Sequence, residues 1–346
     1  MVNYGRFMTI EPVDALRRIA YLLERSRAST YRVQAYRQAA NTLLAIPEAE
    51  VRAQVRAGSL KQLEGIGPST SAVIEEAVAG KVPTKLAELE AEVGGPLVTG
   101  GEMLRSELVG DLHSHSDWSD GGSPIQEMVA TAMELGHEYL ALTDHSPRLT
   151  VANGLTAARL AEQLKVVDSI NTALGGGFRL LKAIEVDILD DGALDQSEEM
   201  LDRLDIRVAS VHSKLKMEST AMTRRMVNAV RNRHTNVLGH CTGRLVTGGR
   251  GKRPQSTFDA RAVFTACVES NTAVEINSRP ERSDPPDDLL ELAIETGCLF
   301  AINTDAHAPG QLDFQAYGCE RAERLGVPAD RIVNTWPLER LLDWAG

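Results

Sequence analysis

Histidine and acidic residues recur at the ends of short apolar runs in the C-terminal two-thirds of the sequence. The run DLHSH places His113 and His115 two residues apart, so on a strand both side chains would face the same side. Asp305 and His307 repeat this spacing near the C-terminus. The other candidates at or just after such runs are Asp120, His145, Glu185, His212 and His240. Imidazole and carboxylate groups bind Zn²⁺, Mn²⁺ and Fe²⁺, so these nine residues predict a site for two or three divalent cations.

A single histidine at the end of a strand is more often a hydrogen-bonded polar residue than a metal ligand. Here six of the eight histidines in the chain occupy such positions, which a chance distribution rarely produces. His137 and His234 fall outside the pattern, and we assign them no role. Asp144, next to His145, is expected to orient a histidine by a hydrogen bond rather than to bind a cation.

Strand-like runs alternate with amphipathic helical segments over residues 107–346. The runs include YLALTDH, FRLLKAIEV, IRVASVH and CLFAINTDAH, and segments such as SPIQEMVATAMELG lie between them. Seven such repeats predict a parallel sheet with crossover helices, which closes naturally into an α/β barrel. The carboxyl ends of the strands meet at one rim of a barrel, so the candidate ligands would converge there.

Residues 1–92 have a different pattern, with apolar residues at helical spacing and no alternating strand signal. They predict a small all-α domain, followed by a glycine-rich linker over residues 93–106. The run LEGIGPS places Gly65, Gly67 and Ser69 before a helix, where backbone N–H groups can hold a phosphate. The alternative is a turn that uses glycine for steric reasons alone.

The chain of 346 residues carries 37 Lys and Arg against 48 Asp and Glu, a net charge of −11. Residues 1–62 are the exception, with ten basic and five acidic side chains, which permits contact with a phosphate backbone. The four cysteines form no CxxC pair and predict neither disulfides nor a zinc ribbon. The sequence has no apolar leader and no apolar stretch of roughly 18 residues, so we expect a cytoplasmic protein without membrane contact.

The ordered motifs of the C-terminal region resemble those of the PHP (polymerase and histidinol phosphatase) family of phosphoesterases. These motifs are DLHSHSDWSDG, LTDHS, IEVDI, ASVHS, LGHCTGR, EINSRPERSD and INTDAH. The resemblance is closest to the PHP domain at the C-terminus of bacterial family X DNA polymerases, and it covers essentially all of residues 107–346. It implies a distorted (β/α)7 barrel with a trinuclear metal site. All nine candidates match the family's ligand positions, with Glu185 as the bridging carboxylate.

We expect the ligands to divide into two sets. His113, His115, Glu185, His212, His240 and Asp305 would hold two cations, and Asp120, His145 and His307 would hold a third. Glu185, Asp305 and His307 are the expected catalytic residues among them. Arg244 in the run HCTGR and Lys214 are candidates for contact with the substrate phosphate, with ordinary surface exposure as the alternative.

Residues 1–92 are similar to the helix-hairpin-helix domain of the DNA polymerase beta type, which implies DNA as a partner. The short linker leaves no room for a nucleotidyltransferase palm, so no polymerase activity is expected. The leading function is a metal-dependent phosphoesterase in DNA repair: a 3′–5′ exonuclease, a 3′-phosphatase or an abasic-site nuclease. A small-molecule phosphatase of the histidinol-phosphatase type is the alternative, and a non-catalytic DNA-binding module is a third interpretation.

Overall fold

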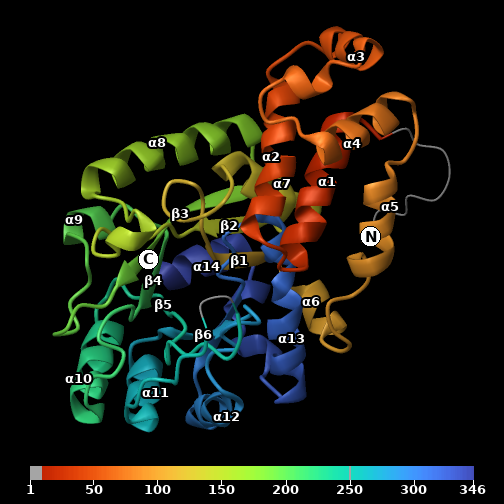
Figure 1. The fold of residues 1–346 in the computed structure, drawn as a ribbon. Coiled ribbons are helices and arrows are strands. Elements are labelled where there is room, and N and C mark those ends of the chain that lie inside the picture. The colour runs from red at the N-terminus through yellow and green to blue at the C-terminus, as the bar shows by residue number, and fades with distance from the viewer. Residues whose placement is uncertain (1–9, 249–250) are drawn as a thin grey trace. The chain divides into compact units, whose positions relative to one another are not determined.

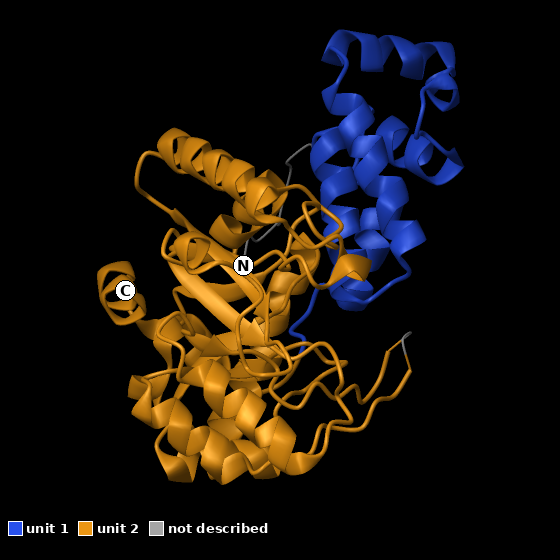
Figure 2. Ribbon diagram, turned by 90° about the vertical axis from the view of Figure 1, so that its left-hand side faces the viewer, with its two compact units in different colours: residues 1–97 blue, residues 98–346 orange. Residues whose placement is uncertain are grey.

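The chain divides into two compact units, residues 1–97 and residues 98–346 (Figure 2). The computed structural model describes residues 10–248 and 251–346, so the start of the predicted N-terminal domain lies outside it. The division falls within the predicted linker 93–106. The second half of that segment is not an irregular connection, because helix α6 (Glu102–Glu107) occupies it and packs against residues of α13 (Gln315–Arg324) within the second unit. Among the described residues, none of the helices combines the length and the apolar character needed to cross a membrane.

The described part of the first unit is all-helical, as predicted. Its helices are α1 (Pro12–Arg25), α2 (Thr30–Leu44), α3 (Glu48–Ala57), α4 (Pro68–Val78) and α5 (Thr84–Val93), with a short 3₁₀ helix η1 (Leu60–Gln62). Helix α1 begins with Pro12, whose fixed φ suits the first helical position. Its residues Leu16, Ile19 and Leu23 recur at helical spacing and are buried in the core of this unit.

The second unit is built on seven parallel strands in the order β1 to β7 (Figure 1). The strands are β1 (Gly110–Ser114), β2 (Tyr139–Leu142), β3 (Arg179–Asp187), β4 (Ile206–Ser210), β5 (Val237–Leu238), β6 (Ala273–Asn277) and β7 (Leu299–Asn303). The first and last strands approach one another, and the N–H of His115 donates to the carbonyl of Ala306 at 2.7 Å. The sheet is therefore a nearly closed barrel of seven strands, which confirms the predicted fold class.

Crossover helices follow the strands on the outside of the barrel, as parallel pairing requires. They are α7 (Ile125–Glu134), α8 (Ala157–Leu174), α9 (Glu198–Leu201), α10 (Ser219–Val230), α11 (Ala260–Glu269), α12 (Asp287–Thr296) and α13 (Gln315–Arg324). Short 3₁₀ helices lie at η2 (Thr150–Ala152), η3 (Pro309–Phe314), η4 (Ala329–Arg331) and η5 (Val333–Thr335). A last helix, α14 (Leu338–Ala345), ends the chain.

Strand alternation places the chemistry at one end of the barrel. On β3, Ala183 belongs to the inner apolar cluster, whereas Ile184 and Val186 belong to the outer one beneath the helices. Because side chains alternate along a strand, Glu185 and Asp187 continue the inner row toward the carboxyl end. The opposite end of the barrel is filled by apolar residues of the strand starts together with Trp336, Leu341 and Ala345. The site is thus confined to the carboxyl rim.

Candidate metal centre

Five histidines surround the carboxylate of Glu185, which is buried at the end of β3. Its Oε1 lies 2.8 Å from Nε2 of His240 and 3.2 Å from Nε2 of His212. Its Oε2 lies 2.9 Å from Nδ1 of His145, 3.4 Å from Nε2 of His113 and 3.6 Å from Nε2 of His115. Glu185 and these histidines together come from the ends of five strands, β1 to β5, or from the loops that follow them, which is the convergence that the sequence predicted.

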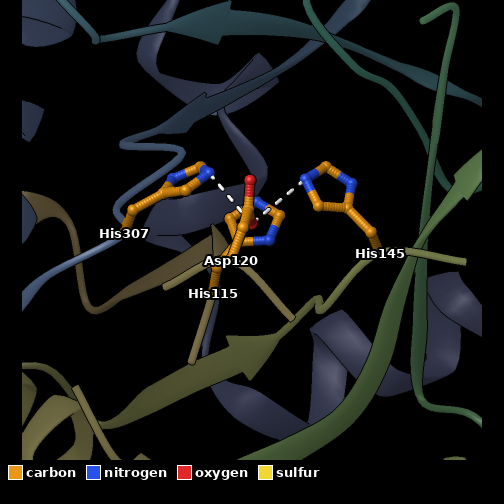
Figure 3. Close-up of side chains that lie close together, drawn as sticks. All are labelled: His115, Asp120, His145 and His307. Atoms are coloured by element: carbon orange, nitrogen blue, oxygen red, sulfur yellow. Dashed lines mark ion pairs between the residues drawn. The ribbon is translucent and has the colours of Figure 1, made fainter. Parts of the chain in front are cut away.

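A second group of ligand atoms lies beside the first and is drawn in Figure 3. It consists of His115, Asp120, His145 and His307, whose ligand atoms all lie within 4.8 Å of one another. Oδ1 of Asp120 is 3.4 Å from Nε2 of both His145 and His307. This group contains the three residues expected to hold a third cation, with His115 in addition.

The buried polar atoms of the centre fit a set of divalent cations. Both carboxylate oxygens of Glu185 are inaccessible to solvent and have no hydrogen-bond partner among the described residues. The same is true of the ring nitrogens that face them in His113, His115, His145, His212 and His240. Leaving so many buried polar atoms unpaired would be costly. Imidazole nitrogens and carboxylate oxygens that converge in this way are the donor set that Zn²⁺, Mn²⁺ or Fe²⁺ binds.

Carboxylate acceptors on the far side of the rings orient two of the histidines. Nδ1 of His113 is 2.7 Å from Oε1 of Glu275, and Nδ1 of His212 is 3.2 Å from Oδ1 of Asp187. An Nδ1–H that donates to such an acceptor leaves the Nε2 lone pair free for a cation. His307 differs, because its Nδ1 faces both an acceptor, the backbone carbonyl of Asp305 at 2.9 Å, and a donor, Nη1 of Arg279 at 2.8 Å.

Glu275 and Asp187 were not among the residues selected from the sequence. Asp187 carries a weak signal, because it stands two residues after Glu185 and therefore shares its face of β3. Glu275 carries another, because it is an acidic residue between the apolar Val274 and Ile276 in the strand AVEIN. Asp144, in contrast, was assigned wrongly. Its carboxylate accepts hydrogen bonds from Ser116, Ser119 and Gln163 and does not bond to a histidine ring among the described residues.

The charges of the centre favour ionised carboxylates. Burial raises the pKa of Glu185, but His212, His145 and His113 outweigh it and hold that pKa well below its usual value. Burial likewise opposes ionisation of Asp305, but Arg282 and Arg279 outweigh it and lower its pKa. Both groups are therefore anionic at neutral pH and require no proton loss before they bind a cation.

Burial lowers the pKa of His115 to about 3, and the nearby His307 and His145 lower it in the same direction. Its imidazole is neutral at pH 7, which is the form that binds metal.

Two arginines that the sequence interpretation passed over flank the last strand end. Nε of Arg282 donates to Oδ2 of Asp305 at 2.9 Å, while Oδ1 of Asp305 is 3.5 Å from Nε2 of His115. Nη1 of Arg279 donates to the backbone carbonyl of Asp305 at 3.1 Å and lies 2.8 Å from Nδ1 of His307. Both arginines belong to the motif EINSRPERSD. Their side chains hold the Asp305 segment in place at the edge of the centre.

Arg244 and Lys214 lie outside these ligand groups. Nε of Arg244 donates to the carbonyl of Arg282 at 3.0 Å, and its Nη2 donates to the carbonyl of Ser283. Arg244 also lines a cavity of about 540 Å³ together with Tyr317 and other residues of α13. Lys214 is mostly exposed and forms an ion pair with Asp190.

The glycine turn before α4 has the predicted form. Gly65 has a φ of +78°, and a Cβ there would lie 2.7 Å from the Gln38 side chain, so the fold itself requires glycine at this position. Gly67 precedes the first residue of α4, with Ser69 in its first turn, and has a φ of −101°. A Cβ at Gly67 would meet none of the described residues within 4 Å. Neither backbone conformation nor crowding therefore explains a glycine at position 67.

Comparisons with known proteins agree with this architecture. Residues 111–279 match the PHP domain, and residues 10–82 match a helix-hairpin-helix domain. The chain is 38% identical over 233 residues to DNA polymerase/3′-5′ exonuclease PolX of Bacillus subtilis, covering 67% of this chain but only 40% of that protein.

A probable phosphatase of Thermoanaerobacter sp. is 28% identical over 241 residues, covering 66% of this chain and 91% of that protein. A solved structure of histidinol phosphate phosphatase from Lactococcus lactis, complexed with zinc, L-histidinol and phosphate, is 19% identical with a TM-score of 0.44. That match covers 62% of this chain and 91% of the other. The chain therefore carries a PHP domain of the phosphoesterase type, preceded by a helix-hairpin-helix domain.

Proposed function

We propose that this protein is a metal-dependent phosphoester hydrolase that acts on DNA as a 3′–5′ exonuclease, 3′-phosphatase or abasic-site nuclease in repair. The observation that carries the proposal is the surrounding of Glu185 by five histidines at 2.8 to 3.6 Å, with its oxygens unpaired among the described residues. Such a donor set suits several divalent cations and little else. The four buried, unpaired cysteines are compatible with a reducing cytoplasm.

The residues that would hold the cations fall into the overlapping groups already described. Glu185 is shared between His113 and His115 on one side and His145 and His212 on the other. Bound Mn²⁺, Zn²⁺ or Fe²⁺ would neutralise charge on the phosphoryl oxygens and lower the pKa of water toward neutrality. Asp120 and His307 would complete the group nearest the surface.

The protein's own contribution is to hold these groups in place before a substrate arrives. The carboxylates of Glu275 and Asp187 keep the imidazoles of His113 and His212 turned with Nε2 toward the centre. Arg282 fixes Oδ2 of Asp305, which leaves Oδ1 directed toward His115. A preorganised polar site of this kind needs little rearrangement when charge develops on a phosphoryl group.

DNA is supported as the substrate by features outside the centre. The first unit matches a helix-hairpin-helix domain, and Gly65, Gly67 and Ser69 stand at the start of α4, where backbone N–H groups are suited to a phosphate. The Bacillus subtilis relative is named as a 3′-5′ exonuclease. We propose that Arg244 contacts a phosphate of the substrate beyond the one that reacts. The exposed ammonium group of Lys214 would attract the negatively charged DNA backbone at longer range.

A small-molecule phosphatase is the second candidate. The observation in its favour is that the PHP region covers 91% of a relative named as a probable phosphatase, so the barrel alone corresponds to such a protein. An enzyme of that kind would not use the helix-hairpin-helix domain for catalysis.

One experiment separates the candidates. The metal-loaded full-length protein and its Gly67→Ala variant are incubated with 3′-labelled single-stranded, nicked and abasic DNA, and separately with histidinol phosphate. Cleavage of DNA that weakens in the variant supports the first candidate. Phosphate release from histidinol phosphate that is equal in both proteins, without DNA cleavage, supports the second. Absence of turnover on every substrate would contradict both and favour a non-catalytic DNA-binding module.

A further inference from the structure

Glu275 lies on β6 inside the barrel, fully buried, and has not been assigned a role as a metal ligand. Its Oε1 is 2.7 Å from Nδ1 of His113 and accepts from Nδ2 of Asn303 at 3.0 Å. Its Oε2 accepts from the backbone N–H of His240 at 2.7 Å and from Nδ2 of Asn277 at 3.1 Å. Each oxygen thus faces two donors, and the carboxylate has little capacity left for a cation.

The amides around Glu275 are themselves fixed in orientation. Oδ1 of Asn303 accepts from the backbone N–H of Leu112 at 3.2 Å and from Nδ2 of Asn334 at 3.1 Å. Asn303 must therefore direct its NH₂ group toward Glu275. A chain of hydrogen bonds therefore links Asn334 to Asn303, Asn303 to the carboxylate of Glu275, and that carboxylate to the ring of His113.

This geometry constrains two residues of the metal centre at once. A carboxylate that is ionised can only accept, so His113 must carry a hydrogen on Nδ1. In the neutral ring, which is the form that binds a cation, the lone pair then lies on Nε2, 3.4 Å from Oε2 of Glu185. The second oxygen anchors the backbone of His240, whose Nε2 is 2.8 Å from Oε1 of Glu185. Glu275 thus holds two different histidines, His113 and His240, each of which faces one oxygen of Glu185.

We propose that Glu275 is a positioning residue that sets the tautomer of His113 and the placement of His240, so that both present Nε2 to the cations shared with Glu185. The proposal rests on the proposed metal-dependent function. It assigns to Glu275 no contact with the substrate or with a cation. A buried charge is costly unless it is fully hydrogen-bonded, and here its four hydrogen bonds offset that cost.

The test is Glu275→Gln in the full-length protein. The amide has nearly the same shape, but its NH₂ group must face two donors in either orientation, so the Nδ1–H of His113 or the N–H of His240 loses its acceptor. Loss of such an outer partner typically lowers metal affinity by about 10- to 100-fold. We expect a loss of this size in zinc affinity, measured by competition with a chelator. In the NMR spectrum of the zinc-loaded protein, the hydrogen-bonded Nδ1–H signal of His113 should move or disappear.

Asp144→Asn is the matched control. It also converts a fully buried carboxylate beside the centre into an amide, but the donors around it are Ser116, Ser119 and Gln163. It should lower the free energy of unfolding as Glu275→Gln does, and it should leave the Nδ1–H signal of His113 unchanged. Glu275→Asp keeps the charge but withdraws the carboxylate, and its zinc affinity should lie between those of the wild type and the Gln variant.

Three results decide the matter. Wild-type zinc affinity and an unchanged His113 signal in Glu275→Gln would overturn the proposal. If that variant does not fold, Glu275→Asp with wild-type affinity and signal would overturn it equally. A wild-type protein that binds zinc with the expected His113 signal, yet hydrolyses no phosphoester, would refute the proposed function while leaving the role of Glu275 intact.

Discussion

Oε1 of Glu185 lies 2.8 Å from Nε2 of His240, yet neither atom has a hydrogen-bond partner among the described residues. The two groups are close enough for a hydrogen bond but are not oriented to form one. A cation located between their lone pairs would satisfy both atoms, which makes this pair the most direct sign of the metal centre.

Replacement of Glu185 with Gln should remove that shared anionic ligand. Because five histidines face this carboxylate, we expect metal content to fall and hydrolysis to drop by at least about 100-fold, while the helices and strands persist. Metal analysis, activity on a labelled oligonucleotide and circular dichroism measure the three quantities. A variant with full activity and full metal content would exclude a bridging role for Glu185.

Removal of the cations should inactivate the protein and lower its thermal stability. Ions that bind only the folded state stabilise it, by about 2.7 kcal/mol at a free concentration 100 times the dissociation constant. Dialysis against a chelator should therefore lower Tm and abolish hydrolysis, and Mn²⁺ or Zn²⁺ should restore both. Mg²⁺ serves as the control, because it prefers oxygen ligands to imidazole. Activity that survives complete metal removal would contradict the mechanism.

The convergence of the candidate ligands could be predicted from the sequence because each stands at or shortly after the end of a strand, where the barrel topology brings it to the rim. Glu275 could not, since it lies within a strand and its partner His113 is 162 residues away in the chain. Arg244 follows His240 closely in the sequence, but the carbonyls of Arg282 and Ser283 that its guanidinium contacts could not be predicted. Such choices depend on how loops pack, and spacing carries no information about them.

Helix α6 shows a second limit. Its sequence follows a glycine-rich stretch, and six residues are too few to form a helix on their own. Packing against α13 stabilises the helix. Gly101, just before it, has a φ of +80°, and a Cβ there would lie 2.4 Å from the backbone nitrogen of Glu320. Gly101, which contributed to the prediction of a glycine-rich linker, is in fact required for this close contact.

The two glycines of the hairpin turn should respond differently to alanine. Gly65→Ala places a side chain at a positive φ, which costs roughly 1–2 kcal/mol, and also displaces Gln38. Gly67→Ala changes only a helix N-cap, with a cost of about 1 kcal/mol or less. We expect Gly65→Ala to lower Tm, and Gly67→Ala to weaken DNA binding at nearly unchanged Tm. Undiminished DNA affinity in Gly67→Ala would assign the turn a purely structural role.

His137 should make the second unit sensitive to mild acid. Its side chain is buried, and Nε2 lies 3.2 Å from both Arg105 and Gln315. Burial, with Arg105 adding to it, lowers the pKa of His137 to about 3 in the folded state, against about 6.5 when unfolded. The unfolded state therefore binds the proton first, and stability present above pH 6.5 is lost as the pH falls toward 3.

Replacement of His137 with Gln should reduce this loss. Urea midpoints measured at pH 7.5 and pH 5.0 should differ more in the wild type than in the variant. His234→Gln is a useful control because it also replaces a buried histidine in the same unit, but one that pairs with Asp202. If the urea midpoint falls equally in the wild type and in His137→Gln between these pH values, the buried ring of His137 does not remain neutral.

Arg244→Gln should distinguish a polynucleotide substrate from a small one. If Arg244 contacts a phosphate beyond the reacting one, the variant should raise KM for an oligonucleotide and reduce the salt dependence of DNA binding by about one unit of slope. Hydrolysis of p-nitrophenyl phosphate should stay the same. Arg261→Gln removes the same charge from α11, where Arg261 pairs with Glu295, and should change neither substrate. An equal loss of activity on the oligonucleotide and on p-nitrophenyl phosphate would mean that Arg244 acts only by holding the loop at Arg282.

Helix α14 has a consequence for how a nucleic acid could be processed. Trp336 and Leu341 fill the amino-terminal end of the barrel, so a strand cannot thread along the axis as it would through a ring-shaped enzyme. If the protein acts on DNA as proposed, the end of a strand would have to approach the centre and leave it by the carboxyl rim. The released fragment and the remaining strand would then share that rim, and the leaving product would compete for space with the terminus that is to be cut next.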